Sequence, residues 1–151
     1  MTELLGYDDD TAFTLMDVAA TVNAIVRRVP AERLRAARFG DWDGVELIGH
    51  VTDVAEVFAE RVRRAVAEDS PALTAIPEGM LGDSQRDPMD LARRLLAAHQ
   101  RIVAALQAPA AASRPAIHQE WGPVNAGHLA AYEAGHSGAH ASEFATAFPP
   151  T

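Results

Sequence analysis

Cysteine is missing from this sequence, and so is lysine. Without cysteine the chain has no disulfide, no thiolate metal ligand and no cysteine nucleophile, so any metal site must use His, Asp and Glu. All 13 basic residues are arginines, against 21 acidic residues, and the formal net charge is −8. Because an acidic surface repels phosphate backbones, we expect no nucleic-acid partner.

Long hydrophobic runs are missing as well. Arg, Asp or Glu interrupts each apolar stretch within a few residues, so the sequence predicts no membrane span. The N-terminus has no basic region followed by an apolar one, which argues against a signal peptide. With 151 residues, of which 48% are hydrophobic and 23% charged, we expect a single soluble domain over residues 1–151, located in the cytoplasm.

What the sequence does contain is helical periodicity. Four segments carry apolar residues at the 3.6-residue spacing of an amphipathic helix, and none reads convincingly as a strand. The expected helices cover residues 11–28, residues 43–68, a segment opening at 87, and a segment from about 125 to before 149. Since each apolar stripe needs a facing partner, the sequence predicts an all-α four-helix bundle.

Helix-start signals support two of these boundaries. Asp43 followed by Glu46 is a capping box, and Asp87-Pro88 supplies a cap and a proline at the first helical position. Residues 68–87 are expected to be a loop and 108–116 a low-complexity connector. The longer connectors at 29–42 and 107–124 leave room for crossovers between helices.

Two of the six histidines lie four residues apart on the expected last helix. His136 and His140 therefore project from one face, within reach of one ion. Chance alone would give about 0.2 such pairs, so the spacing by itself is weak evidence. The pair shares an inward stripe with Glu133, and a buried imidazole without a partner costs about 1–3 kcal/mol. Either a metal or neighbouring side chains must satisfy the two rings.

His50, on the expected second helix, supplies a third donor beside an apolar stripe. Three histidines without a fourth protein ligand leave coordination positions open, which is typical of catalytic sites. The zincin motif H-E-x-x-H is excluded, because no Glu stands between His136 and His140. Glu133 is the inward-facing candidate for orienting a ligand or acting as a base. His99 also lies on an inner stripe, and a satisfied core histidine is its simplest interpretation.

Two glycines lie close to His136 and His140 in the sequence. Gly135 and Gly138 lie inside the expected last helix, where glycine costs up to about 1 kcal/mol relative to alanine. We therefore expect a reason for them, such as a close approach of helices or room for a ligand.

The segment WDGVELIGH, from Trp42 to His50, and the later His136-x-x-x-His140 together resemble the DinB-like superfamily, which includes DNA-damage-inducible and YfiT-type metalloenzymes. The resemblance covers nearly the whole chain. It implies a four-helix bundle of up-up-down-down topology, with His50, His136 and His140 binding one divalent metal ion at one end. It also implies a possible homodimer and a role in stress responses.

Three functions follow as hypotheses. The first is a metal-dependent transferase that uses a low-molecular-weight thiol, of the bacillithiol or mycothiol type, on a small electrophile. The second is a small metal-dependent hydrolase with Glu133 as its base. The third is a non-enzymatic, stress-associated metal-binding protein. Three imidazoles suit Zn, Ni, Fe or Mn, so the sequence leaves the metal open.

Overall fold

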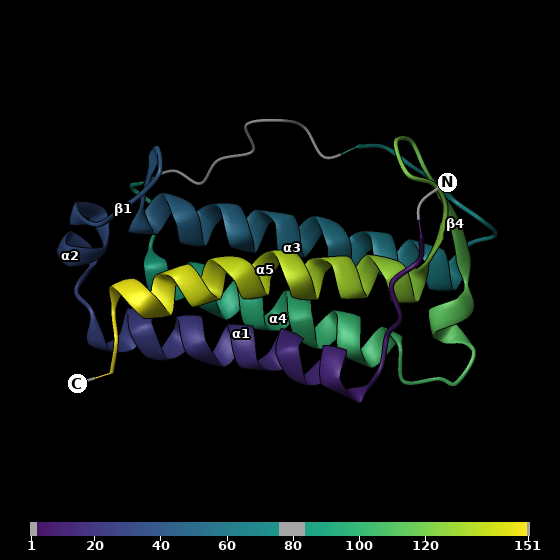
Figure 1. Cartoon of the computed structure of the whole chain (residues 1–151), viewed down its shortest axis with the longest axis horizontal. Coiled ribbons are helices and arrows are strands. Elements are labelled where there is room, and N and C mark those ends of the chain that lie inside the picture. Colours follow the sequence, from purple (N-terminus) through teal and green to yellow (C-terminus); the bar gives the residue numbers. More distant parts are fainter. Residues whose placement is uncertain (1–2, 76–83, 151) are drawn as a thin grey trace.

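Four long helices lie side by side in the computed structural model, which describes residues 3–75 and 84–150 (Figure 1). They are α1 (Asp9–Arg28), α3 (Gly44–Ala67), α4 (Pro88–Ala105) and α5 (Ala126–Ala147). Helix α1 packs against α4 and α5, and α3 packs against the same two helices. Helices α1 and α3 therefore face each other diagonally across the bundle, as do α4 and α5. The predicted four-helix bundle is confirmed.

The helices begin where side chains cap them. The Asp43 carboxylate accepts a hydrogen bond from the Glu46 backbone N–H (2.9 Å), and the Glu46 side chain accepts one from the Asp43 N–H (3.1 Å). This is the predicted capping box, which satisfies two N–H groups at the helix start. Asp87 caps α4 as predicted, and Asn125 caps α5. Helix α1 begins two residues earlier than expected, because Asp8 caps it.

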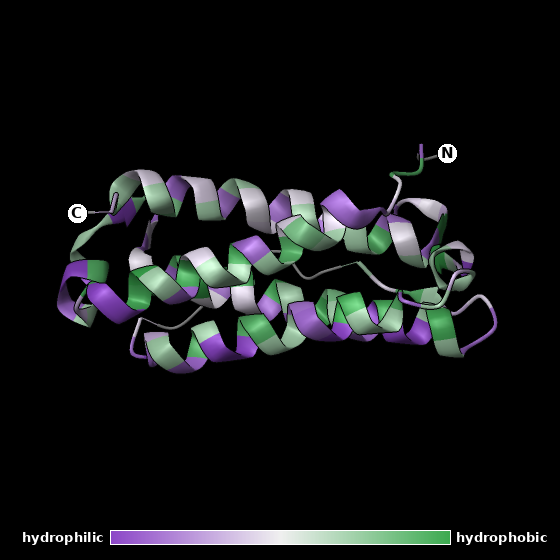
Figure 2. Ribbon diagram, turned by 90° about the horizontal axis from the view of Figure 1, so that it is seen from below, coloured by the Kyte–Doolittle hydropathy of each residue, from purple (hydrophilic) through white to green (hydrophobic). Residues whose placement is uncertain are grey.

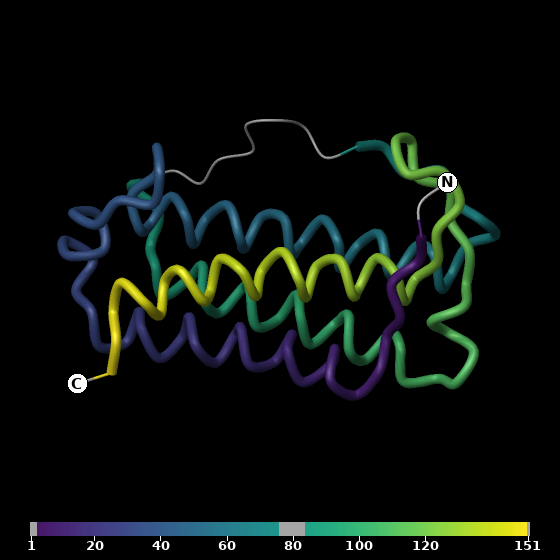
Figure 3. The backbone as a smooth tube through the Cα atoms, in the orientation of Figure 1, coloured from purple at the N-terminus to yellow at the C-terminus, as the bar shows by residue number. Residues whose placement is uncertain are grey.

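The helix directions differ from the expected order. Following the chain in Figure 3 from purple to yellow, α1 and α5 run one way and α3 and α4 run the other. The Thr52 hydroxyl of α3 donates to the Leu91 carbonyl of α4 (3.1 Å), so the first half of α3 lies beside the start of α4. At the other pair, Arg28 at the end of α1 donates to the Phe148 carbonyl just after α5. The order of helix directions is therefore up-down-down-up. The expected up-up-down-down order would make α1 parallel to α3 and α4 parallel to α5. The parallel pairs are instead α1 with α5 and α3 with α4.

The crossover lies at a different connector from those expected. Helices α3 and α4 are consecutive and parallel, so the end of α3 and the start of α4 lie at opposite ends of the bundle; of the expected loop between them, residues 76–83 lie outside the described residues. Residues 29–43 instead form α2 (Ala31–Ala36) and a hairpin of β1 (Arg38–Phe39) and β2 (Trp42–Asp43), which reverse the chain. A Cβ on Gly44 would lie 2.5 Å from the Leu34 carbonyl oxygen, so α3 begins against α2 only because residue 44 is glycine.

A second small sheet lies at the opposite end of the bundle. It consists of β3 (Ala72–Leu73), β4 (Pro115–His118) and β5 (Gly122–Asn125), with β3 parallel and β5 antiparallel to β4. A short 3-10 helix, η1 (Ala111–Ser113), precedes β4. The expectation of no strands is thus wrong. Strands of two to four residues are too short to show an alternating pattern, and tertiary contacts fix their pairing.

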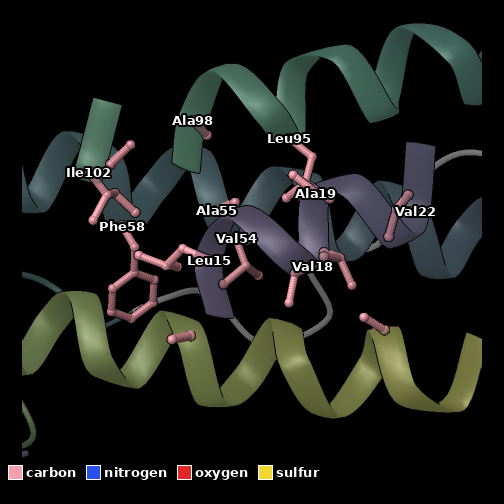
Figure 4. Packing of buried hydrophobic residues seen from close by; sticks show 14 of the residues in the cluster. Leu15, Val18, Ala19, Val22, Val54, Ala55, Phe58, Leu95, Ala98 and Ile102 are labelled. Atoms are coloured by element: carbon pink, nitrogen blue, oxygen red, sulfur yellow. The ribbon is translucent and has the colours of Figure 1, made fainter. Parts of the chain in front are cut away.

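The core runs along the axis of the bundle. Figure 4 shows side chains of α1, α3 and α4, among them Leu15, Phe58 and Ile102, pointing into one interior. Hydrophilic and hydrophobic residues alternate around the helices, as amphipathic packing requires (Figure 2). Among the described residues, no helix combines the length and hydrophobicity needed to cross a bilayer.

Candidate metal centre

Three histidines from two helices meet at one point. His50 comes from α3, and His136 and His140 come from α5. One nitrogen from each ring lies within 4.8 Å of those of the other two. The Nε2 atoms of His50 and His136 are 3.2 Å apart, and the three ring centroids are separated by 4.8 to 5.3 Å. The structure thus brings together all three histidines singled out in the sequence.

Helix geometry and helix packing make different contributions to this cluster. His136 and His140 lie one turn apart on α5, so their rings share a face whatever the tertiary fold. Helices α3 and α5 are antiparallel neighbours, and the beginning of α3 therefore faces the second half of α5 (Figure 1). His50, in the second turn of α3, is placed opposite the pair by this packing.

The donor set fits a first-row divalent metal ion. Two imidazole nitrogens, each about 2.0–2.1 Å from one ion, are about 2.8–3.4 Å apart, from adjacent octahedral to tetrahedral positions. The observed 3.2 Å between the Nε2 atoms of His50 and His136 lies inside this range. All three rings are half-buried rather than solvated, which suits a site that keeps a ligand position accessible.

The protonation of His136 suits a metal ligand. Burial, followed by the neighbouring His140 and His50, lowers the pKa of His136 to about 4. The ring is therefore neutral at pH 7, and a metal ion does not have to displace a proton from it.

Metal-free protein is expected to lose stability as the pH falls from about 6.5 to about 4. In the unfolded chain His136 takes up a proton near its ordinary pKa of about 6.5, whereas in the folded protein it does so only near 4. Between these values the unfolded state binds more protons, so the free energy of unfolding falls by up to about 3 kcal/mol as the pH falls. Urea unfolding of the wild type and His136→Gln at pH 7 and pH 4 measures the effect. An equal loss of unfolding free energy in the wild type and in His136→Gln would contradict this expectation.

Aromatic and acidic neighbours surround the cluster. The Trp42 ring lies 4.4 Å from the ring of His50 and 6.3 Å from that of His140, because β2 leads directly into α3. His140 Nδ1 lies 3.0 Å from a Glu143 oxygen. A carboxylate at this place accepts the Nδ1–H of a neutral ring, which leaves Nε2 as the donor atom for a metal. Glu143 thus contacts one of the three histidines from an exposed position on α5.

Asp53 lies three residues after His50 but takes part in another interaction. Its carboxylate forms an ion pair with Arg86 (2.9 Å) and lies 3.7 Å from Arg94, on the side of α4. These contacts place Asp53 on an ordinary polar face of α3.

Glu133 lies in the core with His99, not on the open side of the cluster. Both side chains are 0% exposed, and His99 Nε2 is 2.6 Å from Glu133 Oε2. The other nitrogen of His99, Nδ1, donates to the Leu15 carbonyl (2.6 Å), since a carbonyl only accepts. Burial raises the pKa of Glu133. The pair joins α4 and α5 diagonally through the centre of the bundle, so His99 is a satisfied core histidine, as expected.

Two buried polar atoms near this pair have no hydrogen-bond partner among the described residues. They are Glu133 Oε1 and His136 Nδ1, on successive turns of α5. Buried polar atoms of this kind are usually satisfied by ordered water.

Gly135 and Gly138 of α5 do not serve a close approach of helices, which was one of the two reasons considered for them. A Cβ on Gly135 would meet nothing within 4 Å, and one on Gly138 would make an ordinary 3.7 Å contact with Thr14. Neither glycine permits a close approach of helices. The close approaches occur at Gly44 and at Gly127, which lies against Ala112 and Tyr7.

Comparison with known proteins agrees with the sequence resemblance. The model of the DinB superfamily matches residues 14–144. Among solved structures the chain is similar to YfiT from Bacillus subtilis, at 18% identity and a TM-score of 0.70, over 95% of this chain and 88% of that one. YfiT is described as a probable metal-dependent hydrolase with an unusual four-helix bundle topology. No curated protein matches significantly.

Proposed function

This chain belongs to the DinB superfamily, and we propose that it is a one-domain, metal-dependent enzyme that binds one divalent ion through His50, His136 and His140. The observation that carries the proposal is the convergence of three half-buried imidazoles, with donor atoms within 4.8 Å of one another. Three protein ligands leave coordination positions for a small molecule, which is the arrangement of a catalytic rather than a structural site.

The residues around the site hold the ligands in place. Glu143 orients His140, and Trp42 covers one side of the cluster by packing on His50. A divalent ion held by three neutral imidazoles keeps its full charge, so it favours the thiolate form of a bound thiol and lowers the pKa of a bound water. Zn, Ni, Fe and Mn all suit such a donor set.

For the reaction, we propose the transfer of a low-molecular-weight thiol, of the bacillithiol or mycothiol class, to a small electrophile. The chain has no cysteine, so a thiol nucleophile must come from outside. The carboxylates near the cluster are already engaged: Glu133 with His99, Glu143 with His140 and Asp53 with Arg86. A thiol bound as thiolate needs no carboxylate base, whereas base-assisted attack by water does.

Hydrolysis is the second candidate, and the description of YfiT as a probable metal-dependent hydrolase favours it. Glu133 is then the base expected from the sequence. Its complete burial and its bond to His99 support a different part for Glu133, namely pairing with His99 in the core of the bundle.

One set of assays distinguishes these functions. Metal-loaded wild type is expected to conjugate a model electrophile with a small thiol faster than the His50→Ala variant does. Glu133→Gln is expected to keep most of this rate. Equal rates for the wild type and His50→Ala would contradict the transferase. Thiol-independent cleavage of ester or amide substrates, lost in His50→Ala, would support the hydrolase, and metal binding without any turnover would support a non-enzymatic metal-binding protein.

A further inference from the structure

Arg61 is a buried cation in the second half of α3, away from the histidine cluster. Its side chain is 7% exposed. Its guanidinium donates to the Thr74 carbonyl just after β3, lies 3.4 Å from His118 Nε2 on β4, and stands 5.7 Å from the centre of the Phe58 ring. All three of these partners are uncharged groups.

His118 does not supply a negative or a shared charge. Burial, and then the charge of Arg61 itself, lowers the pKa of His118. Its Nδ1 accepts hydrogen bonds from the backbone N–H groups of Glu120 and Trp121 (both 3.1 Å), so Nδ1 carries no proton. His118 is therefore neutral at pH 7 and leaves the charge of Arg61 uncompensated.

No carboxylate in residues 3–75 and 84–150 forms an ion pair with Arg61. The nearby acidic residues of α3 each face a different arginine: Asp53 binds Arg86, Glu56 binds Arg94, and Glu60 binds Arg63. Burial lowers the pKa of Arg61, and so does the charge of Arg64, which has the same sign.

A buried charge without a counter-ion is costly, and proteins with such a charge usually provide a partner for it. Arginine also presents several donors in a planar fork that matches a carboxylate or a phosphate. Arg61 is thus placed to bind an anion. No described residue of the chain supplies that anion.

The surroundings have room for a ligand. A groove of about 540 Å³ is lined by Val57, Arg61, Arg64, Thr74 and Ala75, together with the three acidic residues that are paired elsewhere. This volume is in the range of small-molecule sites. Along α3 the groove begins at Asp53, one turn after His50, and Val57 and Arg61 follow His50 by seven and eleven residues on the same face.

We propose that Arg61 binds the anionic group, a carboxylate or a phosphate, of a small molecule that lies in this groove. The eleven residues between His50 and Arg61 correspond to about 16 Å along the helix. We further assign this molecule as the substrate of the metal centre, with its anionic end remote from its reacting end, and this assignment rests on the proposed function.

Anion binding is tested in metal-free protein, so that its failure is separate from failure of the metal site. Inorganic phosphate and citrate are titrated by calorimetry into the wild type, Arg61→Gln, Arg61→Lys and Arg101→Gln. Arg101 is an exposed arginine of α4 and serves as the matched control. We expect Arg61→Gln to weaken binding by at least about tenfold, Arg61→Lys to weaken it less, and Arg101→Gln to leave it unchanged.

A second measurement covers the case in which Arg61→Gln does not fold. In wild-type protein the Nε–H resonance of Arg61 is expected to shift during the titration, and that of Arg101 is not. Binding that is equal in the wild type and Arg61→Gln, or absent from the wild type with both probes, would overturn the site, as would an unshifted Arg61 resonance. None of these results would affect metal binding by the histidines.

Discussion

Replacing His136 with alanine is expected to lower the affinity for a divalent metal by more than about 100-fold. Removing only an outer-shell partner of a ligand typically costs about 10–100-fold, and loss of a ligand costs more. Burial also lowers the pKa of His136 to about 4, so protons do not compete with a metal for this ring at neutral pH. The same loss is expected for His50→Ala, because its Nε2 lies 3.2 Å from that of His136.

Elemental analysis of the purified proteins and titration against a chromophoric chelator measure this effect. The matched control is His128→Ala. His128 lies on the same helix, but its Nδ1 accepts from the Leu5 backbone N–H (2.9 Å), far from the cluster. A His136→Ala protein that retains one equivalent of metal at wild-type affinity would rule out the proposed ligand set.

Replacing His99 with leucine is expected to destabilise the fold by about 3 kcal/mol or more. The change leaves the Glu133 carboxyl buried at 0% exposure without the partner 2.6 Å away. Breaking a buried pair by removing one member typically costs about 3–5 kcal/mol. Glu133→Gln is expected to cost less, since an amide N–H₂ can still donate to His99 Nε2.

Urea unfolding of metal-free proteins at pH 7 checks this expectation. The double variant His99→Leu/Glu133→Leu is the control, because replacing both members of a buried pair by apolar groups is often close to neutral. The double variant should therefore be more stable than His99→Leu alone. If the single variant were as stable as the wild type, the buried pair would have no structural role.

The metal affinity of the variants that fold shows whether the pair of His99 and Glu133 only packs in the core or also positions His136. If Glu133 holds His136 through the two unsatisfied atoms Oε1 and Nδ1, the double variant should fold but bind metal about 10–100-fold more weakly. Unchanged affinity would restrict the pair to a role in the core.

Some features of this protein follow from the sequence alone, because they depend on residues close together in the chain. The capping box of Asp43 and Glu46 marks the start of α3, and Asp87-Pro88 marks that of α4. The four-residue spacing of His136 and His140 places both rings on one face, since the helix repeat determines it. The inward direction of Glu133 and His99 likewise follows from the apolar stripes around them.

Other features depend on how distant segments pack, and no local pattern encodes them. His50 joins the other two histidines only because α3 and α5 are antiparallel neighbours. The pairing of His99 with Glu133 requires α4 and α5 to face each other through the core, and the short strands and the helix directions depend on contacts between remote residues. Arg61 carries no sequence signal among 13 arginines. Its burial, and its lack of a counter-ion among the residues that the structure describes, appear only once β3 and β4 pack against α3. Local periodicity determines which face of a helix is apolar, whereas the choice of neighbouring helix is a property of the whole chain.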